Sequence, residues 1–195
     1  PQKVAEISGT VISAIRTRDI RSIYVTSCYE LEGKSTCASA MAVSLVHSLN
    51  LKTLLIDGSL KPSNLSTVFG LSKGPGWSEY IHSKATENEA IQVSKDYAIH
   101  LMGAGVQKIK DMNGSTSRIL IEKLQKLKEQ FEYVIYDGLS ILSSPETGIL
   151  AKCFDGIVIV VECERTRWEV LQVAKERLEK SGCNILGVVL IKRKY

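Results

Sequence analysis

The chain of 195 residues is 44% hydrophobic and 24% charged, a composition that permits a buried core and excludes a disordered chain. Its 25 basic and 21 acidic residues leave a net charge of +4, which is too small to predict nucleic-acid binding. The longest aliphatic run, residues 157–161, is too short to span a bilayer, and the sequence shows no signal peptide.

The cysteines and the overall organisation predict one domain in a reducing compartment. The five cysteines form no C-x-x-C pair and several lie in apolar runs, which indicates reduced thiols and a cytoplasmic location. No repeat or linker interrupts the sequence, so we expect a single domain over residues 1–195. Because the chain begins at Pro1 rather than Met, we expect this domain to be part of a longer protein.

The first predicted elements are a strand over residues 22–27 and a helix over 37–49, joined by a loop that ends in Gly33-Lys34-Ser35-Thr36. This order predicts a phosphate-binding loop, in which backbone N–H groups and a helix N-terminus surround phosphate oxygens. Lys34 would contact the β- and γ-phosphates, Ser35 would bind Mg²⁺ and Thr36 would contact the α-phosphate. The alternative is an ordinary helix start capped by Ser or Thr, but the flanking strand and helix favour the phosphate loop.

The loop departs from the usual G-x-x-x-x-G-K-[ST] spacing. Cys28 stands where the first glycine is expected, and residues 29–32 contain no glycine but include Glu30 and Glu32. Glycine permits positive φ and a close approach of the backbone to phosphate, which Glu30 and Leu31 do not permit freely. The sequence therefore predicts the architecture of a phosphate loop more strongly than its chemistry.

Beyond this loop the pattern alternates between strands and helices. Further strands are predicted over residues 52–57, 98–102, 133–137, 155–161 and 184–190, and helices over 77–82, 87–93, 115–130 and 166–180. Apolar strands that alternate with helices predict a three-layer, doubly wound, mostly parallel α/β sheet.

Two carboxylates follow predicted strands of this sheet. Asp57 and Asp137 each end an apolar run, and the carboxyl ends of parallel strands meet at the edge where ligands bind. Magnesium on a triphosphate prefers hard oxygen ligands, so Asp137 suits a metal-binding role beside Ser35. Asp57 could bind Mg²⁺ through water or deprotonate a nucleophile. Either residue alone could simply cap a turn, but together with Lys34 and Ser35 they favour a metal–nucleotide site.

With these motifs, the chain resembles the cytoplasmic kinase domain of the bacterial tyrosine kinases of capsular and exopolysaccharide synthesis, relatives of the MinD/ParA P-loop ATPases. The resemblance covers nearly the whole chain. It rests on residues 20–27 as the first strand, Glu32–Thr36 as Walker A, residues 54–57 with Lys61-Pro62 as the second, primed Walker A motif, 133–137 as Walker B, and 185–190 as the last strand.

The resemblance implies an autokinase that uses ATP and Mg²⁺ to phosphorylate tyrosine. Catalytic roles fall to Lys34, Asp57 and Asp137, with Asp57 accepting the tyrosine proton, and metal binding to Ser35 and Asp137. Nucleotide binding falls to Glu32, Gly33, Lys34, Ser35, Thr36 and Arg165. The implied partners are a membrane-embedded chain-length regulator or co-polymerase and further copies of the chain, at the inner face of the cell membrane.

Several positions differ from the pattern of that family. This chain has Glu30-Leu31 where the family has Pro-Gly, Ser59 where it has a carboxylate, and Gly138-Leu139-Ser140 where it has Thr-Pro-Pro. Residues 106–112 replace a proline-rich stretch, and the arginine-bearing helix motif is not present after Glu6. Tyr195 alone stands where the family has a tail with several tyrosines. Two alternatives therefore stay open, a weak or inactive regulatory module and a MinD/ParA-like ATPase. Tyr29 stands where the MinD/ParA pattern has a lysine, which counts against the second alternative.

Overall fold

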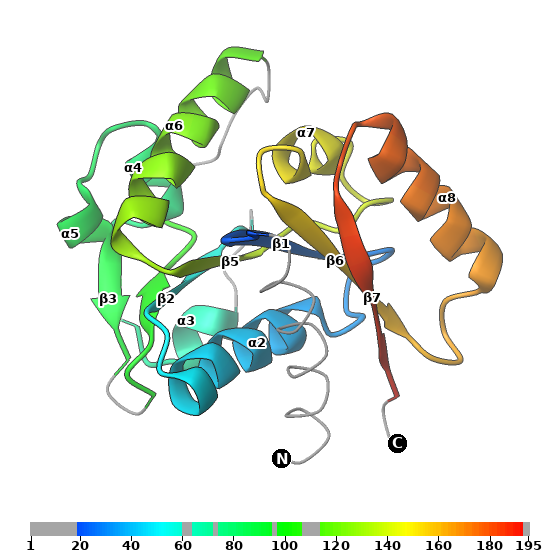
Figure 1. Ribbon diagram of the computed structural model, residues 1–195, viewed down its shortest axis with the longest axis horizontal. Coiled ribbons are helices and arrows are strands. Elements are labelled where there is room, and N and C mark those ends of the chain that lie inside the picture. Colours follow the sequence, from blue (N-terminus) through cyan, green and yellow to red (C-terminus); the bar gives the residue numbers. More distant parts are fainter. Residues whose placement is uncertain (1–18, 60–63, 72–73, 95–96, 107–113, 193–195) are drawn as a thin grey trace.

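The computed structural model describes residues 19–59, 64–71, 74–94, 97–106 and 114–192. Seven strands form one sheet in the order β3-β4-β2-β5-β1-β6-β7, and β3 pairs antiparallel with β4 while the other pairs are parallel (Figure 1). The strands are β1 Ser22–Ser27, β2 Thr53–Asp57, β3 Ile91–Val93, β4 His100–Met102, β5 Tyr133–Asp137, β6 Gly156–Glu162 and β7 Ile185–Ile191.

Helices cover both faces of this sheet. Below it in Figure 1 lie α2 (Lys34–Leu49) and α3 (Asn64–Val68). Above it lie α4 (Trp77–Ile81), α6 (Gly114–Gln130), α7 (Thr147–Ala151) and α8 (Trp168–Lys180), and the short α5 (Glu87–Ala90) lies beside β3. The predicted three-layer, doubly wound α/β architecture is therefore confirmed.

The alternation of side chains along the buried strands divides the core into two clusters. In β1, Ile23 and Val25 face α2, whereas Tyr24 faces the layer of α4, α6, α7 and α8. Both faces of β1 and β6 are buried along their whole length, and those of β5 from Val134 onward, as expected for parallel strands covered on each side. This explains why their sequences read as nearly continuous apolar runs.

The structure corrects one predicted element and adds two helices. The helix predicted over residues 87–93 ends at Ala90, and residues 91–93 form β3 instead. Pairing with β4 overrides the weak helical preference of this short segment, because a three-residue antiparallel ladder satisfies its backbone groups. Helices α3 and α7 were not predicted, since the five residues of each are too few for a periodic pattern.

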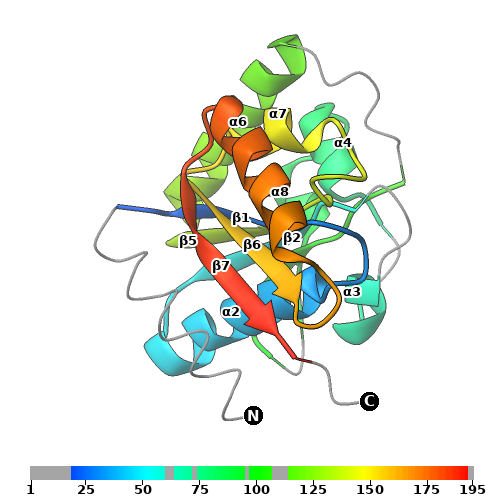
Figure 2. The ribbon, with the colours of Figure 1, turned by 90° about the vertical axis from the view of Figure 1, so that its right-hand side faces the viewer.

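The topology brings the phosphate loop and both aspartates to one edge. Asp57 and Asp137 are direct neighbours across β2 and β5, and Val25 of β1 lies beside Asp137. Strand β7 ends on the same side, with α8 lying along it (Figure 2). The predicted convergence of these residues is confirmed at the level of the strand register.

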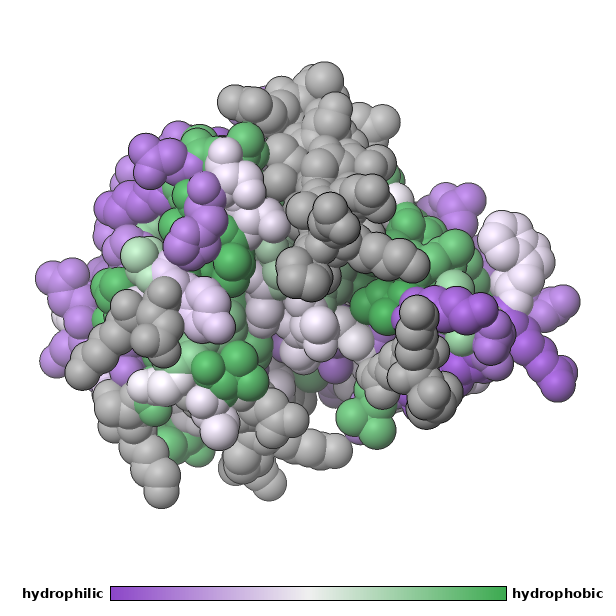
Figure 3. All heavy atoms as spheres, turned by 90° about the horizontal axis from the view of Figure 1, so that it is seen from below, coloured by the Kyte–Doolittle hydropathy of each residue, from purple (hydrophilic) through white to green (hydrophobic). Residues whose placement is uncertain are grey.

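Some sequence-based expectations lie outside the described residues. These are Lys61-Pro62, residues 107–112 of the replaced proline-rich stretch, the segment after Glu6, and Tyr195. Within the described part of the chain, no helix has the length and hydropathy needed to cross a membrane. From below, the described surface shows hydrophilic side chains around the rim with hydrophobic ones among them (Figure 3).

Candidate functional site

The loop from Cys28 to Gly33 carries the chain from β1 into α2. Gly33 lies at the N-cap of α2 with φ 87, a left-handed conformation that glycine adopts without steric cost. Leu31 is also left-handed, with φ 67, although it carries a side chain that is 73% exposed. The loop therefore makes a turn of the kind that glycine favours, with leucine at one of its two left-handed positions.

Glu32 stabilises this loop from inside. Its side chain is fully buried and accepts a hydrogen bond from the Tyr29 backbone N–H at 2.6 Å and another from the Thr166 hydroxyl. A buried carboxylate needs such donors, because its desolvation is otherwise unfavourable. Glu32 thus ties the start of the loop to the segment between β6 and α8.

Arg165 supports the same loop from the β6–α8 segment. Its guanidinium donates to the carbonyl oxygens of Leu31 at 3.0 Å and Glu30 at 3.1 Å, and it forms an ion pair with Glu162 at 3.0 Å. Glu162 ends β6 and its side chain is 2% exposed. The planar guanidinium therefore joins three acceptors at once, a geometry that lysine does not reproduce.

Asp137 ends β5 close to Lys34 and Ser35 in the first turn of α2. Burial raises its pKa to about 6, while a hydrogen bond from Ser35 and the charge of Lys34 act in the opposite direction and the charge of Asp57 adds to the rise. One of its oxygens, Oδ1, is buried and has no hydrogen-bond partner among the described residues. An unpartnered buried carboxylate oxygen is costly, which makes Asp137 a candidate for a ligand interaction.

Asp57 lies at the end of β2 and is 2% exposed. Its Oδ1 accepts the backbone N–H of Ser59 at 3.0 Å, which closes the turn after the strand. Gly58 N–H donates to the Asp137 carbonyl oxygen at 2.9 Å, so the two strand ends are linked by their backbones. Two buried carboxylates at adjacent strand ends give this edge a concentrated negative charge.

The structure places the predicted site residues in two groups. Lys34, Ser35, Asp57 and Asp137 lie together at the strand ends, with Gly33 at the start of α2 and the exposed Thr36 in its first turn. Glu32 and Arg165 instead direct their charged groups into the loop and its support. Sequence reasoning missed Glu162, although it also is a carboxylate that ends an apolar strand, the signal that singled out Asp57 and Asp137.

The donor set fits a magnesium-bound phosphate. A hydroxyl and a carboxylate with an unsatisfied buried oxygen are the hard oxygen ligands that Mg²⁺ prefers, and Lys34 adds a cation for phosphate oxygens. The α2 N-terminus supplies backbone N–H groups that have no partner within the helix. Together these groups complement a polyanion that carries a divalent cation.

The sequence is similar to curated bacterial tyrosine kinases. It is 28% identical over 173 residues to tyrosine-protein kinase YwqD of Bacillus subtilis, covering 89% of this chain and 73% of the relative. It is 29% identical over 189 residues to CpsD of Streptococcus agalactiae, covering 92% and 81%. No family model matches the chain.

Solved structures share the fold. The VpsO kinase domain superposes with a TM-score of 0.82 at 23% identity, covering 99% of this chain and 96% of that one. The kinase domain of the Escherichia coli tyrosine kinase ETK gives a TM-score of 0.84 at 19% identity, covering 98% and 77%. MinD from Pyrococcus horikoshii, solved with Mg-ADP, gives 0.70 at 22% identity, covering 87% and 69%. At these identities the structural likeness establishes the P-loop fold alone.

Proposed function

We propose that this chain, a divergent relative of the bacterial tyrosine kinases, binds Mg-ATP at the carboxyl edge of its sheet and transfers the γ-phosphoryl group to a tyrosine hydroxyl. On this proposal, residues 1–195 act as one nucleotide-binding domain. Both the similarity to named kinases and the grouping of Lys34, Ser35, Asp57 and Asp137 support it.

Each grouped residue has a distinct part in this reaction. Gly33 and the N-terminus of α2 hold phosphate oxygens, and Lys34 balances the charge of the β- and γ-phosphates. Ser35 and Asp137 hold Mg²⁺, which supplies charge neutralisation for the phosphoryl group. Asp57 accepts the proton of the tyrosine hydroxyl, whose ordinary pKa of about 10 leaves little tyrosinate at neutral pH.

The observation that carries the proposal is the buried, unpartnered Oδ1 of Asp137. Burial already raises the pKa of this carboxyl group, so the nucleotide-free protein keeps an unfavourable charge at neutral pH. A divalent cation bound next to Ser35 would relieve this cost. Perturbed carboxyl groups of this kind are characteristic of functional sites.

A second candidate is a regulatory module with weak or no catalysis, and Leu31 favours it. A leucine in a left-handed conformation at the phosphate loop replaces the expected glycine, and Arg165 binds two carbonyl oxygens of this loop. Such a module would signal through a partner rather than through phosphoryl transfer. The phosphorylation experiment distinguishes the two candidates.

Partners and location follow from the same proposal. A membrane-embedded chain-length regulator or co-polymerase of polysaccharide export, further copies of the chain, and a place in the cytoplasm at the inner face of the membrane are expected from the resemblance to the tyrosine kinases. No nucleic-acid partner is proposed, because the net charge is only +4.

The test uses purified protein, including any sequence that follows Tyr195 in the natural chain, with labelled ATP and Mg²⁺. We expect phosphotyrosine that disappears in Asp57→Asn and in the absence of Mg²⁺, while Asp57→Asn still binds nucleotide. Mg-ATP binding without any phosphotyrosine would establish the regulatory module instead. No Mg-ATP binding at all would refute the kinase and favour the regulatory module.

A further inference from the structure

Two buried tyrosines lie on β1 and β5, the neighbouring strands that lead to the candidate site. Tyr24 of β1 and Tyr136 of β5 are fully buried, and their rings stack with centroids 5.2 Å apart and an interplanar angle of 21°. Phe154 packs against both rings, at 5.2 Å from Tyr24 and 5.0 Å from Tyr136, and Trp77 packs against Tyr136 at 5.4 Å. Because aromatic neighbours surround these rings, little space is left for them to move.

Each tyrosine ring occupies the space beside a glycine that follows an active-edge aspartate. A Cβ atom on Gly58 would overlap Tyr136 at Cε1 and Cζ, and a Cβ atom on Gly138 would overlap the same atoms of Tyr24. Gly58 follows Asp57 and Gly138 follows Asp137. The two Asp-Gly steps are therefore in contact with the two rings in the same way.

Neither glycine is required by its backbone conformation. Positive φ values occur at Gly33, Gly70, Gly105 and Gly182 but at neither Gly58 nor Gly138. An L-residue could thus adopt the local backbone, and the constraint at both positions is the ring that fills the space.

The Tyr24 hydroxyl adds a polar contact to the packing. It accepts the backbone N–H of Leu139 at 2.9 Å, so it also holds the residue that follows Gly138. The Thr26 hydroxyl donates to the Leu139 carbonyl oxygen at 2.6 Å. Two side chains of β1 therefore hold the chain after Asp137: Thr26 through a hydrogen bond, and Tyr24 through both a hydrogen bond and the packing of its ring.

We propose that Tyr24 and Tyr136 are positioning residues that set the places of the Asp137 and Asp57 carboxylates by packing against Gly138 and Gly58. The proposal rests on the Mg-ATP site of the proposed function and adds the support on which its two carboxylates depend. Metal ligands require such support, because loss of a group that orients a ligand typically lowers metal affinity by about 10- to 100-fold. The rings act through packing and touch neither metal nor nucleotide.

The experiment compares the affinity for ATP with Mg²⁺ and with EDTA, since placement of the Asp137 carboxylate affects only the magnesium-dependent part. The variants are Gly138→Ala, Tyr24→Leu and the double variant, with Gly187→Ala as the matched control. A Cβ atom on Gly187 has open space, and its φ is not positive, so this substitution adds the same methyl group without a clash. Thermal unfolding confirms that each variant is folded.

We expect Gly138→Ala to reduce the magnesium-dependent gain in affinity by roughly 10- to 100-fold, as seen when support for a metal ligand is lost. Binding in EDTA and the Gly187→Ala control should change little, and Tyr24→Leu should restore much of the gain to Gly138→Ala by removing the clash. Should Gly138→Ala itself fail to fold, Tyr24→Leu alone must lower the gain, because Gly138 then loses its packing surface.

Two results would overturn the inference. One is a Gly138→Ala protein that behaves like Gly187→Ala, and the other is a double variant that is no better than Gly138→Ala. Failure of the proposed function is recognised separately, because it shows in the unmodified protein as an absence of Mg-ATP binding, and the inference then fails with it.

Discussion

At the scale of single residues, the loop between β1 and α2 keeps a phosphate-loop shape although only one of its two left-handed residues is glycine. Gly33 adopts φ 87 at no steric cost, but Leu31 adopts φ 67 against the preference of any residue with a Cβ atom. The contacts of Arg165 with the Glu30 and Leu31 carbonyl oxygens help to maintain this conformation. Backbone strain of this kind concentrates at functional sites.

The strain at Leu31 can be measured by comparing two truncations. Leu31→Gly and Leu31→Ala both remove an exposed side chain, but only glycine accepts the left-handed backbone freely. We expect the glycine variant to be more stable than the alanine variant by about 1 kcal/mol, measured by urea unfolding. Equal stability of the two variants would show that the conformation at Leu31 carries no strain.

At the scale of elements, the β6–α8 segment acts as a support for the β1–α2 loop. It contributes Arg165 and Thr166, whose partners in the loop lie 134 or 135 residues away in sequence, and Glu162, which pairs with Arg165. The loop's own residues contribute Glu32, whose carboxylate receives the Thr166 hydroxyl. The loop conformation is therefore a property of two elements rather than of one local sequence.

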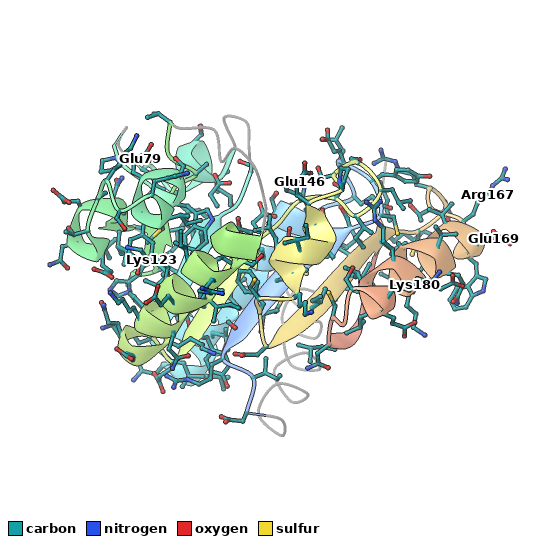
Figure 4. The ribbon with its side chains drawn as sticks, turned by 90° about the horizontal axis from the view of Figure 1, so that it is seen from above. Glu79, Lys123, Glu146, Arg167, Glu169 and Lys180 are labelled. Carbon is teal, nitrogen blue, oxygen red and sulfur yellow. The ribbon has the colours of Figure 1, made fainter. Side chains whose placement is uncertain are left out.

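This dependence predicts a large difference between two neighbouring arginines. Arg165→Ala should lower the unfolding free energy by about 1–3 kcal/mol, because Glu162 and the two loop carbonyl groups lose their donor. Arg167→Ala should cost little, since Arg167 is exposed and points away from the fold (Figure 4). Amide hydrogen exchange of residues 29–36 should rise in Arg165→Ala alone.

Hydrogen exchange also tests whether Arg165 is needed for the loop conformation. Equal hydrogen exchange of residues 29–36 in the two variants would show that the loop holds its shape without Arg165. Arg165→Lys should lie between the two, because a lysine retains the charge but does not donate to three acceptors in one plane.

Elements with a long, regular pattern were predicted from the sequence, whereas those fixed by tertiary contacts were not. The parallel strands and the helices α2, α6 and α8 carry apolar periodicity over enough residues to be recognised. Strand β3 depends on a partner, and α3 and α7 are only five residues long, so none of the three has a local pattern. The candidate site divides in the same way: strand ends revealed Asp57 and Asp137, but the support by Arg165 and Glu162 required the fold.

At the scale of the whole molecule, the sheet places two carboxyl groups with opposite behaviour at its two ends. Asp137 lies at the carboxyl edge, where burial raises its pKa to about 6. Asp155 precedes β6 at the other edge, where burial opposes but hydrogen bonds from Lys128, Ser22 and the Arg21 backbone N–H hold its pKa below the ordinary value. One carboxylate is therefore costly to the nucleotide-free fold, and the other stabilises it.

These shifts predict opposite pH dependence for two substitutions. The raised pKa of Asp137 means that its favourable contribution is complete below the ordinary pKa near 4 and is lost as the pH rises through about 6. Asp137→Asn should therefore stabilise the nucleotide-free protein at pH 8, by about 1–3 kcal/mol, and have little effect at pH 4. Asp155→Asn should destabilise the protein at pH 8, and this loss should shrink as the pH falls through the lowered pKa of Asp155.

Urea unfolding at pH 4, 6 and 8 measures the effect of Asp137→Asn, and further points below pH 4 are needed for Asp155→Asn, because the pKa of Asp155 lies below its ordinary value near 4. Adding Mg-ATP to the same measurements provides the link to function. Ligand binding to the folded state raises the unfolding free energy by about 2.7 kcal/mol at 100 times the dissociation constant. We expect this gain in the unmodified protein but not in Asp137→Asn, which should be more stable without nucleotide but should no longer bind Mg-ATP. If Asp137→Asn proved no more stable than the unmodified protein at pH 8, the buried Asp137 carboxylate would not lower the unfolding free energy as we infer. Its unpartnered oxygen would then no longer support a bound cation.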